Sequence, residues 1–379
     1  QLRRSLHRLC QLAVAPAPAS GLRCRGLAGA TTTYLDVSVP QDDPTVARLY
    51  QAVLNQQRTG LAQAITLVES RHPEKQARGQ ALVNRLLKHL AQRQHKRCFR
   101  VGITGTPGAG KSTFIECIGQ DLVKRQGKRI AVLTVDPSSG ATGGSLLGDA
   151  TRMPELCVHP SAFVRSTPSG GSLGGVARYT QNAAVLCEAA GFDCLLIETM
   201  GVGQAEYQVN DMVDMFLLLQ SPGGGDELQG VKRGVMEVAD LVVVTKCDGN
   251  LIPAANHAAT ELSRALRTYQ RMKHPLSGWR PRVLRCSALT GEGVPEVWQT
   301  VMEFLERVTD SGELVQHRVA QLEKWMWLHV REHLMDLFRE SPAVAATLPA
   351  LLDELRQGLK SPGNAADLLL RCFLENRAR

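Results

Sequence analysis

Hydrophobic and polar residues repeat with different periods along this chain, and the period changes twice. From Pro44 to about Gln94, apolar residues recur every three or four positions in the runs TVARLYQAVLNQQ, LAQAITLVESR and EKQARGQALVNRLLKHLAQ. This spacing predicts three amphipathic helices. Gly60 and Pro73 stand between the runs, where we expect them to separate the helices. Residues 36–98 are therefore expected to form a small N-terminal helical domain.

A different pattern begins at Phe99. Short apolar and β-branched runs alternate with longer helical stretches, and the short runs are FRVGITG, RIAVLTVD, AFVRS, CLLIET, DMFLLLQ, LVVVTK and RVLRCSA. Strands that are apolar on both faces and separated by helices predict a mainly parallel sheet covered on both sides. Glycine-rich loops follow several of these strands, at the edge where open α/β sheets bind ligands. The expected fold class is α/β, with residues 99–308 as the central domain.

From Ser311 onward the pattern is helical again. Seven apolar residues share one stripe of a long helix: Val315, Val319, Leu322, Met326, Val330, Leu334 and Leu337. Trp325 and Trp327 lie on different faces of that helix, so one of them needs a second covering surface. Two hypotheses stay open for residues 309–379. The helix is an arm for self-association, or it packs on the chain's own α/β core.

Composition and charge add a targeting signal. The net charge is +8, yet the first 35 residues carry five arginines and no acidic residue. An arginine-rich, acid-free, amphipathic start is typical of mitochondrial transit peptides, so we expect one at residues 1–35 and a location in the mitochondrial matrix. The alternative is a disordered basic tail. The small excess of positive charge beyond the leader argues against a nucleic-acid partner.

Two further classes of protein are disfavoured by composition. No run approaches the ~20 apolar residues that cross a bilayer, so no membrane insertion is expected. The ten cysteines form no C-x-x-C pair and no cluster with histidine, which supports neither structural zinc nor a disulfide framework. We expect reduced thiols.

Residues 102–116, GITGTPGAGKSTFIE, carry the pattern G-x-x-x-x-G-K-[ST] between a strand and a helix. A loop without bulky side chains can turn its amide groups toward phosphate oxygens, helped by the helix N-terminus. Lys111 is expected to reach the β and γ phosphates, and Ser112 to bind Mg²⁺. The predicted phosphate-binding residues are Gly105, Thr106, Pro107, Gly108, Ala109, Gly110, Lys111, Ser112 and Thr113.

Two later strand ends indicate the base. VVVTKCDGN contains Lys246 and Asp248, and RCSALTGEG contains Ser287, Ala288 and Leu289. The two strings resemble the NKxD and SA(K/L) motifs of P-loop GTPases. Asp248 would accept hydrogen bonds from N1–H and the N2 amine of guanine, which adenine cannot offer, and Lys246 would cover the base. Thr245 replaces the usual asparagine, a change expected to loosen affinity without altering specificity.

Acidic residues at other strand ends are candidate ligands for Mg²⁺. Asp136 and Asp149 lie in VDPSSGATGGSLLGDATRM, and Glu198 lies three residues before Gly201 in IETMGVGQAE. The second string resembles the DxxG motif with glutamate in place of aspartate. Glu198 would hold a water of Mg²⁺, while the Gly201 amide would sense the γ-phosphate. The expected catalytic residues are Lys111, Glu198 and Gly201.

The segment after Gly201 predicts slow turnover. Many small GTPases carry a water-orienting glutamine directly after this glycine, whereas here the residue is Val202 and the glutamine comes at position 204. Valine cannot orient a nucleophilic water, so we expect slow intrinsic hydrolysis that a partner raises. The expected switch or partner-contacting residues are Gly203 and Gln204, with Asp226, Glu227, Lys232 and Arg233 of SPGGGDELQGVKRG. The glycine-rich string STPSGGSLGGVARYT has no assigned role.

Several strings together closely resemble the MeaB/ArgK family of metallochaperone-type P-loop GTPases: GTPGAGKSTFIE, VDPSSGATGGSLLGD, ETMGVGQAE, DMVDMFLLLQSPGGGDELQGVKRG and VVTKCDGN. The resemblance implies a homodimeric GTPase that uses Mg²⁺, binds GTP and GDP, and holds no tightly bound cobalamin. It implies a chaperone that gates adenosylcobalamin loading into methylmalonyl-CoA mutase and protects or reactivates the mutase, with a cob(I)alamin adenosyltransferase as a candidate further partner. It also favours the arm hypothesis.

Three alternative functions fit the sequence less well. A nickel or cobalt metallochaperone GTPase of the same fold would need a His-rich tract or a Cys/His pair, whereas the ten histidines are dispersed. A kinase or transport ATPase is opposed by the guanine-reading Asp248. A scaffold that binds nucleotide without hydrolysing it is opposed by the presence of Lys111, Ser112 and Glu198.

Overall fold

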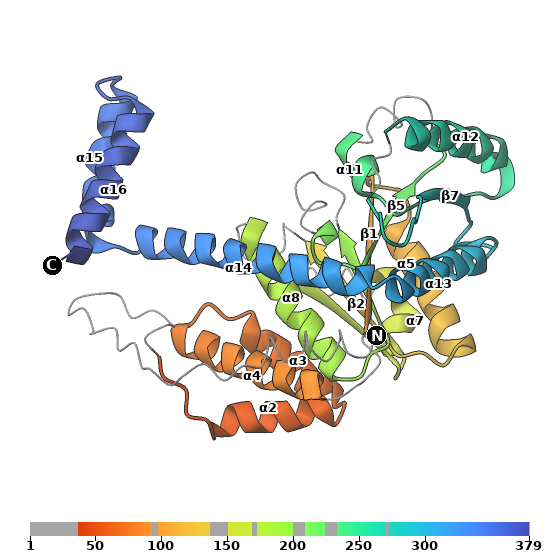
Figure 1. The fold of residues 1–379 in the computed structure, drawn as a ribbon, viewed down its shortest axis with the longest axis horizontal. Coiled ribbons are helices and arrows are strands. Elements are labelled where there is room, and N and C mark those ends of the chain that lie inside the picture. The colour runs from red at the N-terminus through yellow and green to blue at the C-terminus, as the bar shows by residue number, and fades with distance from the viewer. Residues whose placement is uncertain are drawn as a thin grey trace.

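The computed structural model describes residues 37–92, 98–136, 151–168, 173–199, 209–223, 233–269 and 273–378. At its centre is a seven-stranded sheet of order β3-β2-β4-β1-β5-β6-β7, in which the described pairings are all parallel (Figure 1). The strands are β1 (Phe99–Gly105), β2 (Ile130–Asp136), β3 (Ala162–Pro168), β4 (Cys194–Thr199), β5 (Met215–Gln220), β6 (Leu241–Val244) and β7 (Arg282–Arg285). Each predicted apolar run forms one strand, so the predicted α/β fold is confirmed.

The two faces of the sheet bury different apolar layers. In β5, Met215, Leu217 and Leu219 join the layer that includes α5 (Lys111–Gln120) and α13 (Val294–Asp310). Phe216 and Leu218 join the opposite layer, which includes α8 (Leu173–Ala189), α11 (Arg233–Val238) and α12 (Ile252–Tyr269). Because helices cover both faces, the strands read as continuous apolar runs rather than alternating ones.

The three predicted N-terminal helices are present as α2 (Pro44–Leu54), α3 (Arg58–Val68) and α4 (Pro73–Gln92), and α3 and α4 pack on α8. The expectation that Gly60 separates two helices is wrong, because Gly60 is the third residue of α3. A Cβ at this position would lie 2.4 Å from the Cβ of Ala52, so Gly60 permits α2 and α3 to approach closely. Pro73 is the first residue of α4, where its missing N–H costs nothing.

Shorter helical segments complete the described chain. A π-helical turn (Asp121–Arg125) continues α5, α7 (Pro154–Val158) precedes β3, and a 3₁₀ turn (Gly249–Leu251) precedes α12. None of the described helices combines the length and the apolar character needed to cross a bilayer. None of the eight cysteines in the described segments forms a disulfide. The leader expected at residues 1–35 lies outside the described part of the chain.

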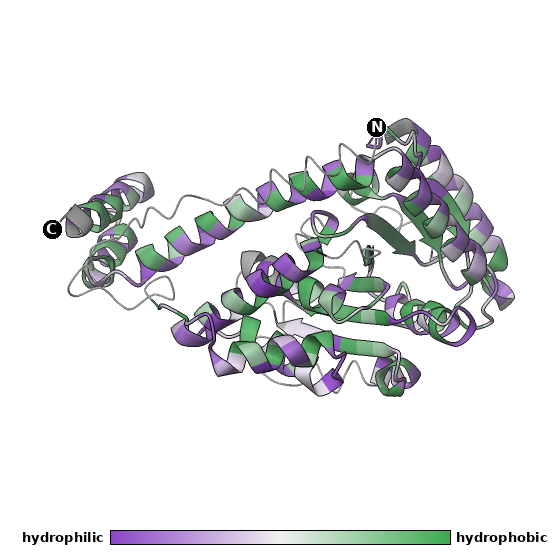
Figure 2. Ribbon diagram, turned by 60° about the horizontal axis from the view of Figure 1, so that its bottom comes forward, coloured by the Kyte–Doolittle hydropathy of each residue, from purple (hydrophilic) through white to green (hydrophobic). Residues whose placement is uncertain are grey.

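The C-terminal region consists of α14 (Glu313–Arg339), α15 (Pro342–Arg356) and α16 (Pro362–Ala378). Figure 1 shows α14 running along the central domain and then beyond it, with α15 and α16 at its far end. Polar and apolar positions alternate along α14 (Figure 2). The polar residues Arg318 and Gln321 are buried against the domain, whereas the predicted stripe residues Val319, Leu322, Met326, Val330 and Leu334 are exposed. The helix therefore presents its apolar stripe to solvent.

The two tryptophans of α14 differ in their surroundings, and each is consistent with a different one of the two hypotheses, packing on the α/β core or self-association. Trp325 is half-buried against the chain's own core, and its indole Nε1 donates to the carbonyl oxygen of Asp211 at 2.9 Å. Trp327 is 61% exposed. Packing on the α/β core therefore accounts for Trp325 and leaves Trp327 available as a contact residue of an arm.

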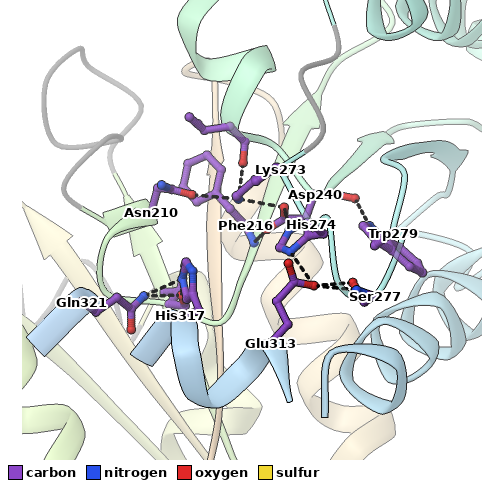
Figure 3. A network of polar contacts seen from close by, with 12 residues as sticks. Asn210, Phe216, Asp240, Lys273, His274, Ser277, Trp279, Glu313, His317 and Gln321 are labelled. Atoms are coloured by element: carbon purple, nitrogen blue, oxygen red, sulfur yellow. Dashed lines mark hydrogen bonds and ion pairs between the residues drawn. The ribbon is translucent and has the colours of Figure 1, made fainter. Parts of the chain in front are cut away.

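The first turn of α14 is fixed by a buried polar network (Figure 3). Asp240, 1% exposed, accepts from Lys273 Nζ at 2.7 Å and lies 2.8 Å from His274 Nε2. Glu313, the first residue of α14, lies 3.6 Å from His274 Nδ1 and accepts from the backbone N–H of Ser277. Burial opposes ionisation of Asp240, but the Lys273 and His274 charges keep its pKa below the usual value. The network joins α14 to the sheet.

Candidate nucleotide site

The P-loop follows β1 directly and leads into α5. Gly105, at the end of β1, has φ of +155°, and a Cβ there would lie 2.2 Å from the carbonyl oxygen of Leu219 in β5. Gly110 caps α5 with φ of +82°, in the left-handed region that favours glycine. Because glycine occupies both positions, the loop can turn sharply and present the amides at the start of α5.

The ammonium group of Lys111 lies inside this loop. Lys111 is the first residue of α5 and is buried, and its Nζ donates to the carbonyl oxygens of Gly105 at 2.9 Å and Thr106 at 3.1 Å. The loop itself is closed by a hydrogen bond from the Ala109 N–H to the Thr106 carbonyl. A positive charge and a helix N-terminus at one point form an arrangement suited to polyphosphate.

Ser112 and Glu198 come together from α5 and β4. The Ser112 hydroxyl donates to Glu198 Oε1 at 2.8 Å, and Glu198 is 4% exposed. A hydroxyl and a carboxylate are hard oxygen donors of the kind that Mg²⁺ prefers, so this pair fits the ion that a P-loop uses. Sequence reasoning expected both residues at the metal.

The base-reading motifs also meet, at the carboxyl ends of β6 and β7. The Ser287 hydroxyl hydrogen-bonds to the Asp248 carboxylate, and the Cys247 N–H donates to the Cys286 carbonyl at 3.1 Å. Ser287 is fully buried, while Asp248 is only partly buried and can meet a base. The carboxylate is therefore oriented before any ligand arrives.

Thr245 has a role that sequence reasoning missed. Its hydroxyl lies 2.7 Å from the Ala109 carbonyl of the P-loop and 3.2 Å from the Gln220 carbonyl of β5, and the residue is 2% exposed. The expected effect of Thr245 on affinity stays a prediction. What the sequence did not predict is that this hydroxyl links the predicted base motif to the P-loop. The available signal in the sequence was a short polar residue directly after the apolar run LVVV.

Of the remaining predicted site residues, some lie in the described part of the chain and others lie outside it. Lys246 is exposed with φ of +54°, a strained value for a non-glycine residue, and Leu289 is 83% exposed beside the half-buried Ala288. Pro107, Gly108 and Thr113 belong to the P-loop and its helix. Asp149, Gly201, Val202, Gly203, Gln204, Asp226, Glu227 and Lys232 lie outside the described residues, as do the side chains of Asp136 and Arg233.

The fold and the site together define a class of protein. The sheet is parallel, a P-loop follows β1, and the Asp248 carboxylate is held at the carboxyl ends of β6 and β7. These are the features of a P-loop nucleotide-binding protein of the GTPase class. Comparison with known proteins narrows this class. Residues 61–343 match the family model described as methylmalonyl Co-A mutase-associated GTPase MeaB. The chain therefore belongs to the MeaB/ArgK family of GTPases.

Individual relatives agree with this assignment. The chain is 48% identical to the mitochondrial methylmalonic aciduria type A homolog of Caenorhabditis elegans, over 90% of this chain and 86% of that protein. It is 49% identical to the homolog of the same name from Mus musculus, covering 86% and 79%. Identity to the GTPase ArgK of Escherichia coli is 44%, covering 78% and 86%.

A solved structure gives the same fold. The crystal structure of a LAO/AO transport system kinase superposes with a TM-score of 0.67 at 35% identity, covering 88% of this chain and 99% of that one. The match includes most of the chain, so the overall architecture is that of this relative.

Proposed function

We propose that this protein is a Mg²⁺-dependent, GTP-hydrolysing chaperone that binds methylmalonyl-CoA mutase, gates loading of adenosylcobalamin and protects or reactivates the mutase. The family description, a mutase-associated GTPase, supports the client. The observation that carries the nucleotide part is the Asp248–Ser287 pair, linked through Thr245 to the loop that holds Lys111. This geometry suits one ligand, a guanine nucleotide with its phosphates on the loop.

Each residue of the site has a proposed task. The loop amides and Lys111 bind the β and γ phosphates and offset the charge that grows as the γ-phosphoryl group transfers. Ser112 and Glu198 would hold Mg²⁺, which would supply neutralisation of the phosphate charge when bound. Asp248 accepts from guanine N1–H and the N2 amine, and leaving that carboxylate unpaired against adenine costs about 1–3 kcal/mol. Lys246, Ala288 and Leu289 flank the base.

Hydrolysis is proposed to be slow without a partner. Val202 cannot orient water, and the switch residues Gly201, Gly203, Gln204, Asp226, Glu227, Lys232 and Arg233 are proposed to respond to the γ-phosphate or to contact the mutase. Asp136 and Asp149 are proposed to complete the surroundings of Mg²⁺. These tasks follow from the sequence motifs and from membership of the family.

The arm is proposed to join two copies of the chain. The exposed apolar stripe of α14, with Trp327 beside it, is a surface that a second copy would cover. We further propose a location in the mitochondrial matrix, and the names of the relatives from C. elegans and M. musculus, which include the word mitochondrial, support the mitochondrion. Contact with a cob(I)alamin adenosyltransferase is proposed from the family resemblance alone.

The test is co-elution with methylmalonyl-CoA mutase in the presence of GDP and of a non-hydrolysable GTP analogue. We expect a complex whose amount differs between the two nucleotides, and loss of that difference in Lys111→Met, which removes the phosphate-binding charge. The matched control is Lys128→Met, because Lys128 lies in the turn before β2, at the edge of the sheet opposite the P-loop. Absence of a complex in both nucleotide states would refute the client.

A further inference from the structure

Gln220, the last residue of β5, has a side chain that the fold itself does not use. The residue is fully buried, and neither Oε1 nor Nε2 of its amide has a hydrogen-bond partner in the part of the chain that the structure describes. Burying an unpaired amide is destabilising, since the group loses its hydrogen bonds to water and gains none. An apolar residue would fill this place at lower cost to the fold.

The register of the sheet fixes the direction of this amide. Gln220 pairs with Val244 of β6, and Val244 belongs to the apolar layer of α8, α11 and α12, on the face opposite α5. Three other fully buried polar residues face the same side at this edge: Thr104, Thr167 and Thr199. Thr104 and Thr199 hydrogen-bond to each other at 2.8 Å. On this face of the sheet, the carboxyl ends of the strands are therefore polar, whereas the earlier residues of the same strands are apolar.

Gln220 also lies directly beside the phosphate loop. Its carbonyl accepts from the Thr245 N–H at 2.8 Å, and the Thr245 hydroxyl lies within hydrogen-bond distance of both that carbonyl and the Ala109 carbonyl. Its neighbour Leu219 pairs with Gly105, the first P-loop residue, so Gln220 stands level with Thr106. The Thr106 hydroxyl oxygen is buried and likewise without a partner among described residues.

We propose that Gln220 is a water-positioning residue for GTP hydrolysis, taking the part that Val202 cannot. An amide oxygen, an amide N–H pair and a hydroxyl give a water the two to four polar partners that it needs in a buried place. The amide is not a base. It orients the water whose oxygen bonds to the γ phosphorus as the bond to the β–γ bridging oxygen breaks. GDP leaves with the electron pair, and the proton of the water passes to the released phosphate.

This inference rests on the proposed GTPase activity, and one substitution separates the two. Gln220→Leu removes both polar groups at similar volume, beside Leu218 and Val244. We expect its unfolding midpoint in urea to equal or exceed that of the native protein, and its affinity for a fluorescent GTP analogue to change less than threefold. Single-turnover hydrolysis at saturating GTP is expected to fall by roughly 100-fold, because a water that is no longer oriented toward the γ phosphorus loses its near-attack geometry.

Two companion variants sharpen the test. Gln220→Glu keeps an oxygen acceptor and is expected to retain at least about tenfold more activity than the leucine variant. Thr167→Val removes a buried hydroxyl on the same face, which has no hydrogen-bond partner among the described residues. Thr167 lies on β3, which β2 and β4 separate from β1, so this variant is expected to hydrolyse GTP at the native rate.

A native rate in Gln220→Leu would overturn this role and leave the GTPase proposal standing. A fall in affinity as large as the fall in rate, or a marked loss of stability, would also overturn it, because a purely structural amide would behave so. Failure of the native protein to bind or hydrolyse GTP would instead refute the proposed function itself.

Discussion

At the scale of single residues, one hydroxyl group joins two motifs that lie 136 positions apart in the chain. The bond from Thr245 to Ala109 ties the loop proposed to read the base to the loop proposed to hold phosphate. We expect Thr245→Val, which keeps the shape and removes the bond, to weaken GDP binding by roughly five- to thirtyfold, from about 1–2 kcal/mol. Isothermal calorimetry measures this. Thr260→Val, which removes an exposed hydroxyl bond within α12, is the control and should bind normally.

A second residue-scale prediction concerns the choice of base. Asp248→Asn exchanges an acceptor for a donor at the base edge, so guanine loses its pairing for the N2 amine. We expect GDP affinity to fall at least about tenfold, and binding of xanthosine diphosphate, which carries a carbonyl there, to rise. Competition titrations with GDP, XDP and ADP measure the preference. Unchanged preference for guanine would show that Asp248 does not read the base.

The local sequence pattern predicts only some of the contacts between individual residues. The motif spacing predicted that Lys111, Ser112 and Glu198 share one site, because strand ends of a parallel sheet meet at one edge. It could not predict that Thr245 bridges to Ala109, since that depends on the three-dimensional distance between β6 and the P-loop. The unpaired amide of Gln220 was invisible for the same reason.

At the scale of elements, α14 is held by charged contacts on its buried side. Arg318 donates to both carboxylate oxygens of Asp214, at 2.6 and 2.7 Å, and to the Cys98 carbonyl. We expect Arg318→Leu to lower the free energy of unfolding by about 3–5 kcal/mol, because Asp214 is left as a buried unpaired charge. Urea titration measures it. The double variant Asp214→Asn/Arg318→Leu should recover part of the loss, and equal loss in both would contradict the account.

Lowering the pH is expected to weaken the packing of α14 on α8 and so to lower the free energy of unfolding. Burial, with the charge of Arg178, lowers the pKa of His329 to about 4 and lowers that of His333. The unfolded histidine titrates near pH 6.5, so the unfolded chain binds protons first and stability is lost as pH falls from about 6.5 toward 4. Burial raises the pKa of Glu332, which acts in the opposite direction.

Unfolding midpoints at pH 7.5 and 5.5 test this dependence, in a Glu332→Gln background that isolates the histidines. His329→Gln should show a smaller loss between the two pH values than its parent. An equal loss would mean that His329 does not carry the effect.

The spacing of hydrophobic residues predicted most of the helices and strands, but it did not predict how they pack against one another. The seven strands and the helices of both flanks follow the predicted runs. Gly60 was misread because glycine breaks helices in isolation, whereas here it admits the Ala52 methyl group of a neighbouring helix. The stripe of α14 was found correctly, but period alone cannot tell whether an apolar stripe faces the core or solvent.

At the scale of the whole molecule, the apolar stripe of α14, which we propose to be an arm for self-association, is exposed in the single chain. We expect the double variant Leu322→Glu/Met326→Glu to be monomeric while the native protein is a dimer, because charges in a covered apolar stripe are costly. Both side chains are exposed in the single chain, so the unfolding midpoint of the monomer should hardly change. Light scattering after gel filtration measures the mass. Glu323→Gln is the control on the same turn, and a monomeric native protein would contradict the arm.

The most direct test of the whole account is the rate of GTP hydrolysis with and without methylmalonyl-CoA mutase. The account predicts slow turnover of GTP by the protein alone, no turnover of ATP, and a rise of at least about tenfold when the mutase is added. Equal turnover of ATP, or a rate that the mutase leaves unchanged, would contradict it.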